Sequence, residues 1–140
     1  MEPITIQFIK SKVVELLLRE SSTNSDPTYH FELSLSRIPD EESIIIHIKA
    51  ILSYQNTEIA HIKTENIFKA LRLNDILAEN GGCLPRQLLS ICISISFSTM
   101  RGIFAQIMAN TELNSIMFPI INPDQWVQGV LEQTEKHPLD

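Results

Sequence analysis

Glycine and cysteine are scarce in this 140-residue chain, and their scarcity excludes several kinds of chemistry. It has four glycines, with no glycine-rich phosphate loop, no nucleophile elbow and no His-Glu-x-x-His motif. The two cysteines, Cys83 and Cys92, lack the spacing of a metal site, so we expect reduced thiols. The sequence therefore indicates neither a catalytic centre nor a cofactor, and we expect a protein that is not an enzyme.

Positive charge is also in short supply. Eleven Lys and Arg residues stand against 17 Asp and Glu residues, so the formal net charge is −6 and the isoelectric point is near 5.2. Nucleic acids and anionic membrane surfaces are normally bound through clustered basic residues, so this balance argues against both as partners. It suits a protein that must stay in solution while it exposes apolar grooves.

The chain shows no signal peptide and no convincing membrane span. Glu2 stands where a signal peptide would have its basic region. The most apolar stretch, residues 88–108, is interrupted by serines, a threonine and Arg101, whereas a span needs about 20 mostly apolar residues. We therefore expect no membrane insertion, and we infer a cytoplasmic location.

His47, His61 and Cys92 are the remaining candidates for chemistry. The two histidines are predicted on neighbouring strands of a hairpin, where a simple register puts His61 nearer Ala50 than His47. A metal site needs a third ligand, so ordinary strand histidines are the better interpretation. Cys92 is predicted in the middle of an apolar helix, where burial raises a thiol pKa and makes the thiol inert. We expect no metal site.

The first half of the chain is rich in strand patterns. Residues 29–35 alternate between apolar and polar side chains, which is typical of a half-buried strand. Residues 44–52 form a second strand whose second face is half apolar, so we expect packing on both sides of the sheet. Gln55-Asn56 then turns the chain into a third strand near residues 57–64. The length fits one domain over residues 1–140.

Two segments fit more than one structure. Residues 4–18 match a long strand or a helical stripe, and Val13-Val14 slightly favours the strand. Residues 90–98 alternate isoleucine with serine, as a strand would, but the longer window predicts a helix from Pro85 to about Asn110. The helix accounts for more residues and has a proline at its start, so we adopt it.

Further elements are predicted around the long helix. Residues 66–80 are expected to be mainly helical or irregular, and Asn80-Gly81-Gly82 ends them. A final helix is expected to open at Asn122 or Asp124. Trp126 has the spacing of a packing residue in that helix rather than of a ligand-stacking aromatic.

Arg101 interrupts the apolar surface of the long helix, and the sequence leaves its role open. It suits the binding of an anion and also a pair with a carboxylate such as Glu112. A buried arginine must be paired in either case, so the pattern alone does not choose between the two interpretations.

Four groups of residues resemble the SecB family of export chaperones, and they occur in the family's order. They are Ile4-Thr5-Ile6-Gln7-Phe8-Ile9, then Ile67-Phe68, then Leu84-Pro85-Arg86-Gln87 through Arg101-Gly102-Ile103-Phe104, and finally Phe118-Pro119-Ile120-Ile121-Asn122-Pro123-Asp124. The resemblance implies an α+β fold with a four-stranded antiparallel sheet, one long helix and a short carboxy-terminal helix. It also implies a homo-oligomer, either a dimer or a dimer of dimers.

The same resemblance implies a function. The family holds unfolded preproteins, so we expect an ATP-independent chaperone that binds unfolded or preprotein segments in apolar grooves, with protein export as one use. The alternative is a dedicated interaction module of the same fold, which serves one partner such as an antitoxin and has no export role.

Two sets of apolar residues are expected to carry this function. Because related chaperones form part of their client channel between hairpin and long helix, the client-binding groove is expected at Phe68, Leu71, Leu73, Ile76 and Leu77. The long helix is apolar on more faces than one sheet covers, which predicts an interface between copies. The oligomer interface is expected at Ile6, Phe8, Ile91, Ile95 and Phe97.

One departure from the family concerns the export motor. The family binds its translocation ATPase through an acidic face on the first strand and the hairpin. Val13, Leu17 and His61 stand at the corresponding positions here, and none of them is acidic. An electrostatic interface that lacks its charges binds weakly, so engagement of the export ATPase is doubtful.

Overall fold

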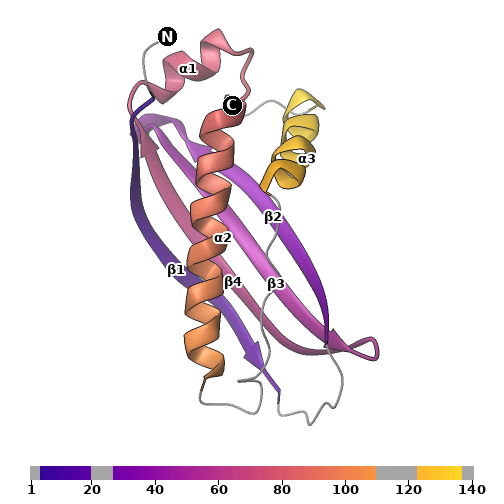
Figure 1. Cartoon of the computed structure of the whole chain (residues 1–140). Coiled ribbons are helices and arrows are strands. Elements are labelled where there is room, and N and C mark those ends of the chain that lie inside the picture. Colours follow the sequence, from indigo (N-terminus) through magenta and orange to yellow (C-terminus); the bar gives the residue numbers. More distant parts are fainter. Residues whose placement is uncertain (1–3, 20–26, 110–122, 137–140) are drawn as a thin grey trace.

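A computed structural model describes residues 4–19, 27–109 and 123–136 of the chain. Four strands form one antiparallel sheet in the order β1-β4-β3-β2, with α2 crossing one face and α3 beside it (Figure 1). The predicted four-stranded antiparallel sheet with one long and one short carboxy-terminal helix is therefore confirmed. The elements are β1 (Ile6–Leu18), β2 (Thr28–Ile38), the 3-10 helix η1 (Pro39–Glu41), β3 (Ser43–Tyr54), β4 (Thr57–Ala70), α1 (Leu73–Glu79), α2 (Arg86–Met108) and α3 (Pro123–Lys136).

The core lies between α2 and the two central strands. Every second residue of β3 from Ile44 to Leu52 is fully buried, and Ile62 and Phe68 of β4 are buried on the same face. From α2 the core receives Leu88, Leu89, Cys92, Ile93, Met100 and Phe104. Alternate side chains of the strands and side chains at helical spacing on α2 thus pack together in one apolar layer.

Both neighbouring strands, β1 and β3, pair with the last residues of β4. The strand interpretation of the first segment is confirmed, and β1 pairs with β4 from Ile6 opposite Ala70 to Leu18 opposite Ala60. Residues 66–70 are therefore strand, so the prediction of a helix beginning at residue 66 is wrong. In the folded chain, buried Asn66, Phe68 and Ala70 alternate with less buried neighbours, as in a strand that is covered on one face.

Helix α2 confirms the helical interpretation of residues 90–98. It begins after Pro85, which occupies the N-cap position, and ends at Met108. By length and apolar composition α2 could cross a bilayer, but here its buried side chains pack against β3, β4 and α3. The final helix begins at Pro123 with Asp124 in its first turn, while Asn122 lies outside the described residues.

The expectation of packing on both sides of the sheet is not met within the described chain. Helices α2 and α3 lie on the same face, and no described helix covers the other one (Figure 1). On that uncovered face, which we call the outer face, Ile45, Ile51 and Ile67 remain half-buried. The half-apolar pattern of β3 therefore marks a surface with apolar side chains rather than a second covered layer.

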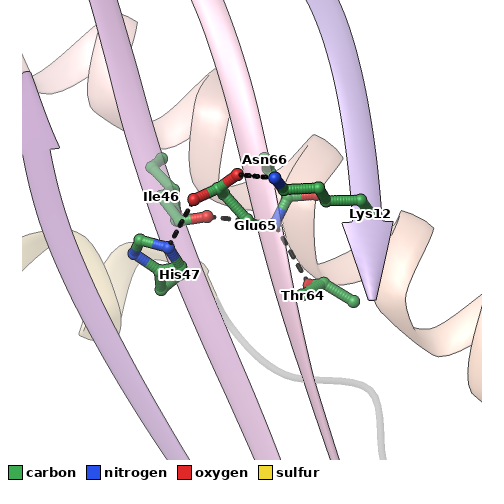
Figure 2. Close-up of polar contacts among 6 residues, drawn as sticks. All are labelled: Lys12, Ile46, His47, Thr64, Glu65 and Asn66. Carbon is green, nitrogen blue, oxygen red and sulfur yellow. Dashed lines mark hydrogen bonds and ion pairs between the residues drawn. The ribbon is translucent and has the colours of Figure 1, made fainter. Parts of the chain in front are cut away.

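Asn66 is a fully buried polar side chain in the middle of the sheet (Figure 2). Its Nδ2 donates hydrogen bonds to the Ile46 carbonyl at 3.1 Å and to Thr64 Oγ1 at 3.2 Å. Ser11 Oγ donates to Asn66 Oδ1 at 2.7 Å, which links β1 to β4. Because a buried amide must be satisfied, these bonds favour one register of the three strands over its alternatives.

Glu65, the next residue, points to the outer face (Figure 2). Its two oxygens contact Lys12 Nζ and His47 Nε2, each at 3.1 Å. The hydrogen bond from Lys12, followed by that from His47, holds the pKa of Glu65 below its usual value of 4.5. Three strands are thus joined by ionic contacts on one face and by the Asn66 amide on the other.

Replacing Asn66 by leucine should destabilise the protein by about 1–3 kcal/mol, because Ser11 and Thr64 lose their buried partner. Ser11→Ala removes a single hydrogen bond and should cost about 0.5–1.5 kcal/mol. Urea unfolding of both variants measures the two effects. A leucine variant as stable as the native chain would show that the buried amide does not stabilise the sheet.

Glu65→Gln should lower stability at neutral pH and have progressively less effect in acid. A carboxyl whose pKa is depressed by folding stabilises the folded state above its unfolded-state pKa, and that contribution disappears as the pH falls through the folded-state pKa. The urea midpoints of variant and native chain should therefore differ at pH 7 and differ less at an acidic pH below the usual carboxyl pKa of 4.5. A difference that is the same at both pH values would contradict an ionic role for Glu65.

Candidate functional site

The histidines of the hairpin do not assemble a metal centre. Within the described part of the chain, no group of three His, Cys, Asp or Glu side chains is placed to hold a metal ion. His47 lies opposite Glu65 and His61 lies opposite Ile51, so the two rings do not face each other. Each ring contacts its own carboxylate at 3.1 Å, His47 that of Glu65 and His61 that of Glu58.

Cys92 and Arg101 lie on the same helix and offer no reactive group. Burial raises the pKa of the Cys92 thiol to about 12, so the thiol keeps its proton at neutral pH and is a poor nucleophile. Arg101 is half-buried on α2. Glu112, its predicted partner, lies outside the described residues, and both interpretations of this arginine stay open.

An open pocket of about 710 Å³ lies where the start of β1, α1 and the start of α2 come together. We call it the α1 pocket. Apolar side chains and polar groups alternate around it, and a pocket of this size holds several side chains of a ligand. Its lining residues are Ile4, Thr5, Leu71, Arg72, Asp75, Ile76, Glu79, Asn80, Pro85 and Gln87.

A sharp turn after β4 holds the rim of the α1 pocket. The Leu71 N–H donates to the Thr5 carbonyl at 3.1 Å, and the Arg72 N–H donates to Glu42 Oε2 at 3.2 Å. Arg72 has a left-handed φ of 62°, and its Nε donates to Asp75 Oδ2 at 3.3 Å. A non-glycine residue in this conformation costs about 1–3 kcal/mol, so the surrounding bonds must hold it. The result is that Leu71 projects outward and is 66% exposed.

The five residues predicted for the client groove do not form one exposed strip. Leu71 and Ile76 line the α1 pocket, whereas Leu73 and Leu77 are buried on the core side of α1. Phe68 belongs to β4 and is fully buried against the core. The prediction assumed one helix over the whole segment. Because the chain changes from strand to helix between Ala70 and Leu73, the apolar side chains are divided between core and surface.

A second apolar surface lies along β1 on the helix side of the sheet. Phe8, Val13 and Leu16 lie opposite residues of β4 that are themselves fully buried, yet they are 38%, 39% and 45% exposed. Their exposure follows from the position of α2, which packs on β3 and β4. We call these three residues the β1 strip.

The residues predicted for the oligomer interface are likewise separated by the fold. Phe8 and Ile91 are 38% and 41% exposed, and Ile6 and Ile95 are half-buried. Phe97 is only 5% exposed, because it packs inside a single chain. The first four residues keep exposed surface that a second copy could cover. Phe97 is already buried within one chain, so its burial does not require a second copy.

Phe97 belongs to an aromatic cluster that fixes α3 against the sheet. Its ring centroid lies 5.3 Å from that of Phe31 and 5.8 Å from that of Trp126. Trp126 also lies 5.7 Å from Phe31, which confirms its predicted packing role. A small cleft of about 170 Å³ remains between β2 and α3.

Sequence patterns missed several residues of the α1 pocket. Thr5, Arg72 and Glu79 are not part of any apolar periodicity, and they meet only because β1 pairs with the end of β4. The one available signal was Leu71, an apolar residue just beyond the alternating pattern of β4. Leu71 continues neither the buried face of β4 nor the buried face of α1, so its side chain is expected at the surface.

Comparison with solved structures gives a likeness in fold. No protein-family model matches the chain, and no curated protein is similar to it at a significant level. A solved structure of a SecB-like chaperone from Mycobacterium tuberculosis, in complex with a peptide from an antitoxin, has a TM-score of 0.54 and 13% sequence identity. The match covers 84% of this chain and 88% of that chain. The chain therefore has a SecB-like fold.

Proposed function

We propose that this protein binds polypeptides in the manner of a chaperone, holding extended apolar segments of unfolded clients without ATP and without catalysis. The single observation that carries the proposal is Leu71 at the rim of the α1 pocket, an apolar side chain held 66% exposed beside a hollow of about 710 Å³. Exposed apolar surface that is rimmed by polar groups is typical of interaction sites.

The lining of the α1 pocket suits an extended segment. Leu71 and Ile76 offer apolar contacts to client side chains. Asn80 and Gln87 supply amide groups that can bond to a client backbone. An unfolded segment presents both kinds of group in alternation, so it can use the apolar and polar parts of the pocket together.

The fold comparison supports binding of a polypeptide. The Mycobacterium tuberculosis SecB-like chaperone was solved with a bound antitoxin peptide, so that fold can hold a peptide. The same observation favours a second candidate function, a dedicated module that serves one partner such as an antitoxin. We place the general holding function first because the α1 pocket combines apolar and polar groups without a charge pattern that selects one sequence.

We further propose that the protein acts in the cytoplasm as a homo-oligomer and engages an export ATPase weakly. The β1 strip supports oligomerisation, because it leaves apolar side chains at the surface of one chain. Val13, Leu17 and His61 supply no acidic residue for an electrostatic contact with that ATPase.

Replacing both Leu71 and Ile76 by serine should weaken client binding and leave the fold intact. Each apolar side chain buried by a client contributes about 1.5–3 kcal/mol, so the double variant should bind roughly a hundredfold more weakly or worse. The measurement is the affinity for a permanently unfolded, carboxymethylated model protein, together with the thermal unfolding midpoint.

Two control variants separate binding from folding. Val14→Ser removes an apolar residue that is 42% exposed on β1 and does not line the α1 pocket, so it should bind clients normally. Leu73→Ser places a hydroxyl in the core and should lower the unfolding midpoint. Native-like client binding by the Leu71→Ser, Ile76→Ser variant would show that the α1 pocket is not the client site.

The general and the dedicated function predict different client ranges. A general holding protein should suppress the aggregation of several unrelated unfolded proteins at comparable concentrations. A dedicated module should protect one partner and leave the others to aggregate. Light scattering of four or five chemically denatured proteins, diluted with and without the chain, distinguishes the two.

Replacing Val13 and Leu16 by serine should shift the protein toward monomer, because the β1 strip loses the apolar area that a second copy would cover. Light scattering should give a multiple of 15.9 kDa for the native chain and a lower mass for the variant at micromolar concentration. Val14→Ser is again the matched control. A native chain that scatters as a monomer at this concentration would rule the assembly out.

A further inference from the structure

The outer face of the sheet gathers most of the lysines of the chain. Five of the six lysines lie on it, although the chain as a whole carries a net charge of −6. Each of these lysines is placed on the outer face by one of two observations. Either it alternates along its strand with buried core residues, or it lies opposite a residue of the outer face on the neighbouring strand. They are Lys10, Lys12, Lys49, Lys63 and Lys69.

The carboxylates on this face are already engaged. Glu65 contacts Lys12 and His47, and Glu15 contacts Lys49 at 3.5 Å (Figure 2 shows the first group). The remaining two glutamates contact histidines. These are Glu32 with His30 at 3.6 Å and Glu58 with His61 at 3.1 Å.

The surplus charge on the outer face is therefore positive. Lys10, Lys63 and Lys69 form no ion pair with any residue in the described part of the chain. Lys63 is half-buried and lies between Glu15 of β1 and Lys49 of β3, and the Glu15 carboxylate contacts Lys49 rather than Lys63. Lys63 therefore faces the like charge of Lys49 without an ion pair of its own. A partner with carboxylates would supply these lysines with the negative charge that they lack.

Apolar side chains lie directly beside these lysines. Lys10, Ile67 and Ile45 occupy one row across β1, β4 and β3, and Lys69 is two residues from Ile67 along β4. Neighbouring positions in such a row are about 5 Å apart, and positions two residues apart on a strand are about 7 Å apart. A pair of half-buried isoleucines is thus flanked by two unpaired lysines.

We propose that the outer face is a docking surface for an acidic, partly apolar polypeptide segment, with Lys10, Lys63 and Lys69 meeting its carboxylates and Ile45 and Ile67 meeting its apolar side chains. The partner binds on the side of the sheet opposite α2. It can therefore be held while the α1 pocket is occupied, and the proposal does not rest on the client-binding function.

Other occupants fit this face less well. A symmetric contact with a second copy would offer these lysines only the glutamates of the same face, and each of those already contacts a lysine or a histidine, so self-association brings no free carboxylate. Clustered lysines can bind phosphates, but four glutamates lie among these lysines and would repel a nucleic acid. Phe8, Phe31 and Phe68 of the strands lie on the helix side, so they cannot stack on bases at this face. The isoleucines between the lysines match the side chains of a polypeptide instead.

The test uses the full chain and a fluorescent peptide of alternating glutamate and leucine or valine. The native chain should bind it, and the affinity should fall as salt is raised, because unpaired charges attract the peptide. A triple variant, Lys10→Gln, Lys63→Gln and Lys69→Gln, should bind at least tenfold more weakly. The triple change of the same lysines to arginine should retain binding.

Controls separate this surface from the α1 pocket and from general charge. The Leu71→Ser, Ile76→Ser variant should bind the acidic peptide like the native chain, and so should Arg86→Gln, which removes a positive charge from the start of α2. In the Leu71→Ser, Ile76→Ser background, where the α1 pocket no longer contributes, a peptide with lysine in place of glutamate should not bind. The proposal is overturned if the triple glutamine variant binds like the native chain, or if an oligonucleotide or anionic lipid vesicles bind more tightly than the acidic peptide.

Discussion

The packing of a single long helix on a four-stranded sheet is the constraint on which the rest of the structure depends. A helix with its side chains is about 10–12 Å wide, whereas four strands spaced about 4.8 Å apart present a broader face. Helix α2 therefore buries the apolar residues of β3 and β4 and leaves β1 beyond its reach. Helix α3 covers part of β2 through the contact of Trp126 with Phe31. The exposed apolar side chains of β1 are a consequence of this mismatch in width.

The same constraint divides the surface into regions with different chemistry. At the end of the sheet, the pairing of β1 with β4 brings Thr5 next to Leu71, and the turn at Arg72 creates the α1 pocket. On the side away from α2 the sheet carries lysines and half-buried isoleucines. One chain thus presents exposed apolar side chains on its helix side and a mixed basic and apolar surface on the other.

Periodicity predicted the elements well wherever a single pattern persisted. The alternation in residues 29–35 and 44–52 became β2 and β3, and the helix predicted from Pro85 to about Asn110 became α2. The prediction failed at residues 66–70, because five residues of strand pattern were attached to a helical pattern that followed. Pairing with both β3 and β1 extends β4 through this segment, from Ile46 opposite Asn66 to Ile6 opposite Ala70, and these contacts are distant in sequence.

The sequence by itself determined the buried face of each central strand and the lack of a conventional catalytic motif, because these depend on local spacing and residue type. The fold class followed from the resemblance of four groups of residues to the SecB family. The sequence also indicated that residues 68–77 contain more apolar side chains than one buried face of a helix needs. Only the tertiary structure decided which of them reach the surface. Leu73 and Leu77 turn to the core and Leu71 and Ile76 to the α1 pocket, because a left-handed residue at Arg72 sets the direction of α1. That direction depends on hydrogen bonds to Thr5 and Glu42, far away in the chain, which no local pattern contains.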